Sequence, residues 1–135
     1  MGINQRSLKE ATMRTVSTDL NILIRPTELT EAIDTMPEGL TQAGYQVSEI
    51  HAQVVDLTCE PDNMLVTQFS QMAGYPPITE VLHRVVVNGE SDAALKDLTK
   101  MVVKNLPEGA YWYGTSLEGA TEPGVNAACA WQHGN

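Results

Sequence analysis

The chain has 135 residues, of which 42% are apolar and 19% are charged, and its net charge is −9. This length and composition are typical of one folded domain with its own core, which excludes wholesale disorder. The negative charge disfavours direct binding to nucleic-acid phosphates or anionic lipid surfaces, and it allows a cationic protein partner. We therefore expect a single domain over residues 1–135, of which residues 1–25 could form an N-terminal helical arm.

The N-terminus and the two cysteines indicate an intracellular setting. The first residues are polar and lack the apolar segment of a secretory signal. No apolar run approaches the roughly 18 residues that span a bilayer. Cys59 and Cys129 are too few for a disulfide framework. We expect a cytoplasmic protein, or a virion-associated one if it derives from a phage.

The first elements in chain order are predicted to be helices. Ser7 and Glu10 have the spacing of a capping box, and apolar residues with helical spacing follow, which predicts an amphipathic helix over residues 7–20. Residues 21–24 could instead form a short strand.

A second helix is predicted to begin near Thr27. Pro37 should break or restart it, because proline lacks the backbone N–H that a helix interior needs. Gly44 is a suitable C-terminal stop.

A strand and a third helix follow. Residues 46–58 read as the first long strand, with an imperfect alternation that allows a β-bulge. The turn at 59–63 contains Asp62 and Asn63, either of which can cap a helix that stops at Gly74.

The last third of the chain contains the clearest strand and the clearest helix. Residues 79–87 are rich in valine, and residues 88–91 are predicted to turn into a helix over 92–106 with one apolar stripe. The whole order predicts an α+β fold with two layers. We expect helices mainly on one face of a mixed sheet of about four strands, over 46–58, 79–87, 110–117 and 125–132.

Charged residues are distributed unevenly. Residues 1–25 carry a net charge of +2, residues 26–83 contain no Lys or Arg and carry −9, and residues 84–135 carry −2. Such asymmetry suits docking within the chain, between copies, or on a basic partner protein. The predicted electrostatic halves are the basic Arg6, Lys9 and Arg14 and the acidic Glu28, Glu31 and Glu38.

Three consecutive aromatic residues stand out in a chain that is poor in them. On a strand, Tyr111 and Tyr113 face one way and Trp112 faces the other. One side must belong to the core, and the other could supply the exposed aromatic side chains that anchor interfaces. We therefore predict Tyr111 and Tyr113 as binding residues.

A competing prediction places a catalytic or ligand site at two turns, residues 58–63 and 88–91. Cys59 follows a strand and precedes a helix N-terminus, which lowers a thiol pKa, whereas Glu60 beside it raises that pKa. Ser91, in the second turn, would share an edge with Cys59 if the strands were parallel.

The histidines and the second cysteine have structural interpretations. His83 shares a strand face with valines, which favours a hydrogen-bonded structural histidine. Cys129 and His133 would lie about 13 Å apart on a strand, too far to bind one zinc ion together. We expect no metal and no cofactor.

The leading functional hypothesis is a non-enzymatic interaction or assembly component, a small acidic accessory protein of bacterial or phage type. It would self-associate or bind a basic partner protein. The first alternative is a small enzyme or ligand-binding domain that uses the two turns. The second alternative is an inhibitor whose acidic surface mimics nucleic acid.

Overall fold

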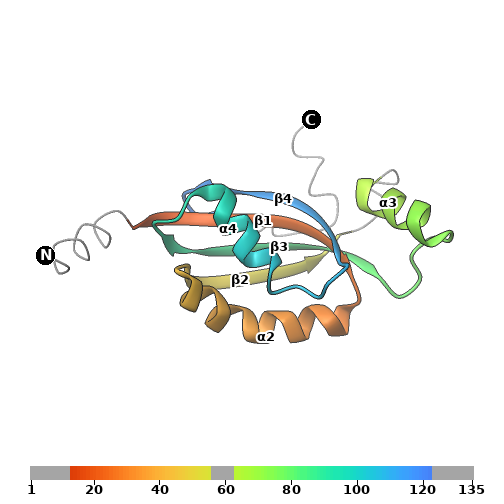
Figure 1. The fold of residues 1–135 in the computed structure, drawn as a ribbon, viewed down its shortest axis with the longest axis horizontal. Helices are drawn as coiled ribbons and strands as arrows, with labels where there is room; N and C mark the ends of the chain where they lie inside the picture. The colour runs from red at the N-terminus through yellow and green to blue at the C-terminus, as the bar shows by residue number, and fades with distance from the viewer. Residues whose placement is uncertain (1–12, 56–62, 123–135) are drawn as a thin grey trace, which may run out of the picture.

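The computed structural model describes residues 13–55 and 63–122, which form one open four-stranded sheet and three helices. The order is β1 (Arg14–Ile24), α2 (Pro26–Ala43), β2 (Gln46–Val54), α3 (Met64–Ala73), β3 (Val81–Ser91), α4 (Leu95–Val103) and β4 (Tyr111–Glu118) (Figure 1). The strand order is β2-β3-β1-β4. This is a βαββαβ connectivity of two split βαβ units, with α3 inserted between β2 and β3.

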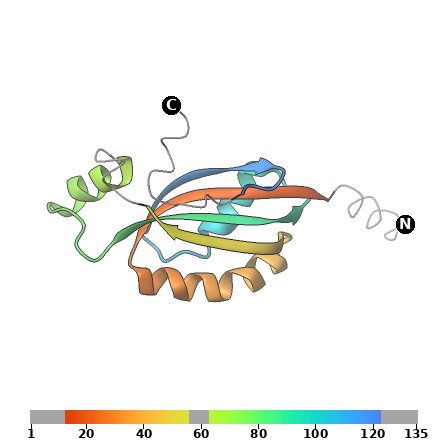
Figure 2. The same cartoon turned by 180° about the vertical axis from the view of Figure 1, so that it is seen from behind.

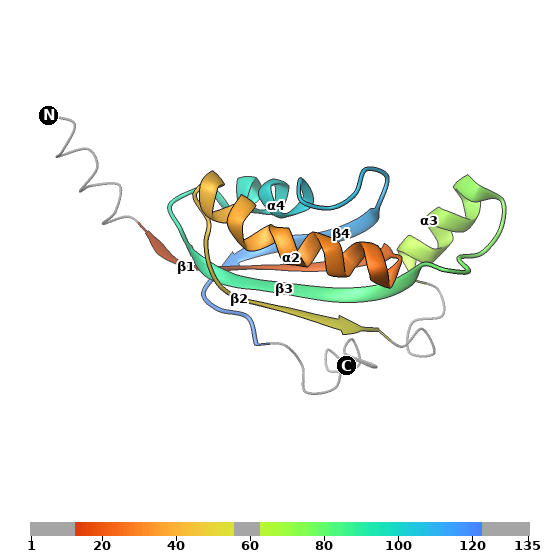
Figure 3. The ribbon, with the colours of Figure 1, turned by 90° about the horizontal axis from the view of Figure 1, so that it is seen from below.

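The helices α2 and α4 lie side by side on one face of the sheet, and α3 lies beyond one end of it (Figure 3). Figure 2 shows the opposite face, which these two helices leave uncovered. The predicted two-layer α+β fold is confirmed. The sheet is antiparallel rather than mixed, because each helical crossover skips one strand and another strand fills the gap.

The predicted helix over residues 7–20 is wrong from Arg14 onward, where β1 begins. Val16, Leu20 and Ile22 face α2 and α4 in the main core. Ser17, Asn21 and Leu23 alternate with them, point to the other face and are buried as well. When both faces of a strand are buried, apolar residues occupy consecutive positions and not only alternate ones. Some of them then fall three or four residues apart, which is also the spacing of a helix. Ser7 and Glu10 lie outside the described residues.

Pro37 lies inside α2 and does not break it, contrary to the prediction. The helix begins with Pro26 at its first turn and ends at Gly44, whose φ of 104° is the left-handed conformation that glycine favours. An internal proline costs about 3 kcal/mol. Each fully buried large apolar side chain contributes about 1.5–3 kcal/mol, and α2 buries four residues: Leu29, Ala32, Met36 and Leu40.

Two local predictions in the middle of the chain are confirmed. The register of β2 against β3 shifts between Val47 and Glu49, which is the expected bulge. Asn63 caps α3, because its Oδ1 accepts hydrogen bonds from the backbone N–H groups of Leu65 (2.8 Å) and Val66 (3.3 Å). The helix stops at Gly74, also as predicted. Asp62 lies outside the described residues.

The turn predicted at residues 88–91 is absent, because β3 continues through Ser91 and pairs with β1 there. Gly89 lies opposite the β2 bulge, where a Cβ atom would stand 2.1 Å from the carbonyl oxygen of Gln46. The glycine therefore permits close strand approach here, not a turn. The predicted strand at 110–117 is confirmed as β4, whereas the one at 125–132 lies outside the described residues. The strand that completes the sheet is β1.

A chain of four hydroxyl groups is buried between the sheet and the helix layer. The Tyr45 hydroxyl lies 3.0 Å from Thr18 Oγ1 and donates a hydrogen bond to the carbonyl oxygen of Val87 at 3.1 Å. Thr18 Oγ1 lies 2.8 Å from Ser116 Oγ, which lies 2.8 Å from Thr99 Oγ1. Through Tyr45, just after the Gly44 cap of α2, these hydroxyl groups tie β1, β3, β4 and α4 together. Burial raises the pKa of Tyr45, although the Thr18 hydrogen bond lowers it.

We expect Tyr45→Phe to lower the free energy of unfolding by about 1–2 kcal/mol, because it leaves buried partners without their hydrogen bond. A raised folded-state pKa gives stability that is present below the unfolded pKa, about 10, and is lost as the pH rises above it. Urea titrations at pH 7 and pH 10.5 would measure both effects. Equal stability of wild type and variant at pH 7 would contradict the prediction.

Candidate interaction surfaces

The inner side of α3 packs onto one end of the sheet. Leu65 is fully buried in a second apolar cluster with Leu23, Val55 and Leu82. Phe69 meets the ring of Tyr111 edge-on at a centroid distance of 5.6 Å and that of Tyr75 at 6.0 Å. These contacts fix the orientation of α3, and so they decide which of its side chains point outward.

Four large apolar side chains on α3 and on the segment after it are exposed, and the exposed side chains between Met64 and Met72 are polar but uncharged. The exposed fractions are 57% for Met64, 76% for Met72, 55% for Tyr75 and 80% for Ile78. No charged residue occurs from 63 to 79. We call these four side chains the α3 surface. Grouped exposed apolar side chains mark contact sites, and methionine adapts its shape to different partners.

A cavity of about 120 Å³ lies beside α3 and has three glutamates among its lining residues. Glu28, Glu80 and Glu108 line it, together with the aromatic rings of Phe69 and Tyr111. We call it the acidic cavity. The Nε atom of Arg25 lies 3.6 Å from Glu80 Oε2, the one ion pair that the described residues make with these three carboxylates.

Glu80 is held in its charged form. Desolvation raises the pKa of this carboxyl group. Hydrogen bonds from the backbone of Glu80 and Ile78 and from the Thr79 side chain, together with the charge of Arg25, lower it by more. The net pKa is below the ordinary value. The acidic cavity therefore keeps a negative charge at neutral pH, which favours a cationic group as its occupant.

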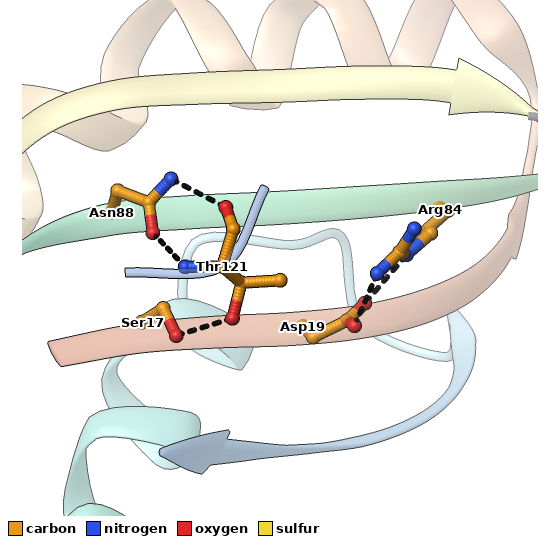
Figure 4. Close-up of polar contacts among 5 residues, drawn as sticks. All are labelled: Ser17, Asp19, Arg84, Asn88 and Thr121. Carbon is orange, nitrogen blue, oxygen red and sulfur yellow. Dashed lines mark hydrogen bonds and ion pairs between the residues drawn. The ribbon is translucent and has the colours of Figure 1, made fainter. Parts of the chain in front are cut away.

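The face of the sheet opposite α2 and α4 carries polar side chains near its centre (Figure 4). Arg84 donates two hydrogen bonds to Asp19, from Nε to Oδ1 at 3.0 Å and from Nη2 to Oδ2 at 2.7 Å. Thr121 exchanges two backbone hydrogen bonds with the Asn88 amide and places its hydroxyl 2.6 Å from Ser17 Oγ. These contacts hold the segment after β4 against β1 and β3.

One buried acceptor on that face lacks a donor within the described part of the chain. Asn21 is 2% exposed, and its Oδ1 atom has no hydrogen-bond partner there. An unsatisfied buried polar group costs about 1–3 kcal/mol. A donor supplied to this atom would therefore stabilise the fold.

The structure uses Arg14 within the chain. Its Nη1 atom donates to the carbonyl oxygens of Ser91 and Ala93, both at 2.7 Å, and its Nε lies 3.2 Å from Glu118 Oε2. The other two residues of the predicted basic half, Arg6 and Lys9, lie outside the described residues. A binding role for all three remains a prediction.

The acidic half lies on α2, and its members have different surroundings. Glu28 lines the acidic cavity. Glu31 and Glu38 are exposed on the outer side of the helix. The structure therefore separates one acidic residue that faces a cavity from two that face solvent.

Tyr111 and Tyr113 are half-buried and pack against the second apolar cluster, on the side of the sheet opposite α2 and α4. Trp112 points to the other side and is 37% exposed. The predicted alternation along the strand is confirmed. The binding role of the two tyrosines remains a prediction, and Trp112 is the more accessible of the three rings.

The premise of the alternative site at the two turns is wrong. Val54, at the end of β2, pairs with His83 near the start of β3, whereas Ser91 pairs with Arg14 at the far end. His83 and Ser91 are eight steps apart on the strand, a span of about 26 Å. Antiparallel pairing therefore puts the end of β2 and residues 88–91 at opposite ends of the sheet.

Ser91 itself has a structural role. It is fully buried, donates a hydrogen bond to the carbonyl oxygen of Gly44 at 2.7 Å and accepts one from the backbone N–H of Ala93 at 3.1 Å. Cys59 and Glu60, the other members of that candidate site, lie outside the described residues.

His83 is buried, and its Nδ1 lies 2.9 Å from the carbonyl oxygen of Val81, as predicted for a hydrogen-bonded structural histidine. Burial lowers the pKa of His83, although the Val81 hydrogen bond raises it. His51 differs, because it is half-buried and its Nε2 lies 3.1 Å from Glu49 Oε2.

We expect acid to destabilise the fold partly through His83. A lowered folded-state pKa gives stability that is present above the unfolded pKa, about 6.5, and is lost as the pH falls towards the folded-state value. Urea titrations from pH 7.5 to 5 should show a smaller loss of stability in His83→Gln than in wild type. Parallel curves for the two proteins would contradict this, and His51→Gln serves as the matched control.

The chain matches no protein-family model, no curated protein and no solved structure. Within residues 13–55 and 63–122, no three His, Cys, Asp or Glu side chains gather as a metal site. None of the helices in those ranges has the length and apolar character needed to cross a bilayer. The α3 surface was not among the predicted sites, although the uncharged run of residues 63–79 was a signal for it.

Proposed function

We propose that this protein is a non-enzymatic interaction or assembly component that docks a basic partner protein over the α3 surface. A Lys or Arg side chain of that partner would enter the acidic cavity. The observation that carries the proposal is the exposure of four large apolar side chains, Met64, Met72, Tyr75 and Ile78, on an uncharged segment beyond one end of the sheet.

Apolar burial is the source of affinity in this proposal. Removing apolar surface from water contributes about 25 cal/mol per Å². Because Leu65 and Phe69 hold α3 against the second apolar cluster and Tyr111, its exposed side chains are presented on an ordered helix. A partner therefore binds without having to order the helix first, which lowers the entropic cost of association.

The acidic cavity supplies the charge preference. Among the described residues, Arg25 is the one basic residue that forms an ion pair with these three glutamates, at 3.6 Å from Glu80. A cation in this position would face carboxylates and two aromatic rings, and the faces of such rings also attract cations. Complementary charge speeds association and selects the partner more than it adds affinity.

A titration with two synthetic helical peptides of equal length tests the proposal. One peptide is built of Leu and Lys, and the other of Leu and Glu. We expect the Leu/Lys peptide to shift backbone NMR signals of α3 and of residues around Glu80 and Glu108. We expect the Leu/Glu peptide to leave these signals unchanged.

Paired variants separate docking on α3 from general attraction to an acidic protein. Met72→Glu and Ile78→Glu should each weaken binding of the Leu/Lys peptide about tenfold, because a carboxylate would be buried in an apolar contact. Leu117→Glu is the matched control, since Leu117 is 50% exposed on β4. Equal affinity in all three variants, or signal shifts confined to other surfaces, would refute docking at α3.

A further inference from the structure

The helix layer carries two rows of opposite charge. Lys96, Lys100 and Lys104 follow one another at four-residue spacing along α4 and the residue after it, and all three are exposed. Glu31, Asp34 and Glu38 form an exposed row on α2. Both helices lie on the same face of the sheet (Figures 1 and 3), so both rows belong to one side of the molecule.

The two rows match in length and are not neutralised where they stand. At a rise of 1.5 Å per residue, the lysine row is about 12 Å long and the acidic row about 10 Å, with roughly one charge per turn in each. The ion pairs found among the described residues involve none of these six side chains. Each row is therefore free to meet a row of opposite sign on another molecule.

We propose that two copies of this chain associate through the helix layer, with α2 of each copy facing α4 of the other. A two-fold axis running along the layer between the helices produces this arrangement, and both contacts are then the same by symmetry. The acidic row of each copy then meets the lysine row of the other, so that the dimer contains two such contacts. The basic residues involved are those of α4, not Arg14.

Trp112 provides an apolar anchor beside the lysine row. It lies in a cleft with Val103, Lys104, Leu106 and Pro107, and 37% of its surface is exposed. Tryptophan is the residue type most often found to carry binding energy at interfaces. The helix layer thus combines charge complementarity, which selects the partner, with an aromatic side chain that can be buried on contact.

The proposal concerns a different surface from α3, so each can fail without the other. It is tested by sedimentation equilibrium of the full chain at 0.1 M and 1 M NaCl. We expect a dimer whose dissociation constant rises at least about tenfold in 1 M salt, because the Debye length falls from about 10 Å to 3 Å. Met72→Glu should leave this dimer unchanged.

Charge exchange makes the test specific. One variant carries Lys96→Glu, Lys100→Glu and Lys104→Glu, and the other carries Glu31→Lys, Asp34→Lys and Glu38→Lys. In a dimer of either variant with itself, both contacts between α2 and α4 would bring like charges together. Each variant alone should therefore be monomeric. An equimolar mixture restores opposite charges at both contacts and should form a heterodimer, which also shows that both variants fold.

Three outcomes would overturn the proposal. One is a wild-type chain that stays monomeric up to about 0.5 mM in 0.1 M salt. Another is a dimer that survives either triple reversal. A mixture of folded variants, with wild-type-like circular dichroism, that fails to form the heterodimer would likewise exclude pairing of α2 with α4.

Discussion

Gly89→Ala is expected to lower the free energy of unfolding by about 3 kcal/mol. A Cβ atom on residue 89 would lie 2.1 Å from the carbonyl oxygen of Gln46 and 2.9 Å from its carbonyl carbon. These are backbone atoms at the β2 bulge, so the clash is relieved only if β2 moves away from β3. Overpacking of this kind typically costs 1–3 kcal/mol, and more where the backbone must shift.

Urea denaturation followed by circular dichroism measures this loss. Gly39→Ala is the matched control, because its Cβ would approach the flexible side chain of Asn105, at 2.6 Å from Oδ1. Glycine inside a helix costs about 1 kcal/mol relative to alanine, so this control should stay within about 1 kcal/mol of wild type. A Gly89→Ala protein as stable as the control would contradict the close approach of β2 and β3.

The second large effect is expected at the Asp19–Arg84 pair. Its side chains are 24% and 16% exposed, and the two hydrogen bonds form a bidentate contact. The hydrogen bond with Asp19 raises the pKa of Arg84, so the guanidinium stays charged. Asp19→Ala would leave that charge largely buried and without its partner, and we expect a loss of about 2–3 kcal/mol.

A double-mutant cycle separates the pair from its surroundings. Arg84→Met keeps the apolar stem of the side chain and removes its charge. The double variant should be more stable than Asp19→Ala alone, because it leaves no unpaired charge, and the coupling should be about 1.5–2 kcal/mol. Additive losses in the cycle would show that the contact contributes nothing specific.

These two positions bear on the function, because they hold the sheet on which both proposed surfaces stand. Gly89 lets β2 pair closely with β3, and β3 begins at the end of the insertion that contains α3. The Asp19–Arg84 pair joins the two central strands, β1 and β3. Loss of peptide binding or of dimerisation in these variants should therefore follow their loss of stability and should not occur in protein that remains folded.

Local signals in the sequence determined several elements correctly. Asn63 and Gly74 delimit α3, and the irregular alternation after Gln46 marks the bulge, because caps and bulges depend on a few neighbouring residues. The valine-rich strand and the helix after it were also predicted, although the strand continues to Ser91 and the helix spans only Leu95–Val103. The exception is Pro37, where four buried residues on the far side of α2 outweigh a local signal.

What the sequence alone determined is therefore the α+β class, most helix ends and the separation of charge along the chain. The tertiary structure alone decided the strand order, the strand identity of β1 and the place of residues 88–91 in β3. Each depends on which segments pair over long stretches of chain, as Arg14 does with Ser91, and local propensity carries no record of that pairing. The same long-range packing determined which side chains of α3 stay exposed and placed α2 and α4 on one face of the sheet.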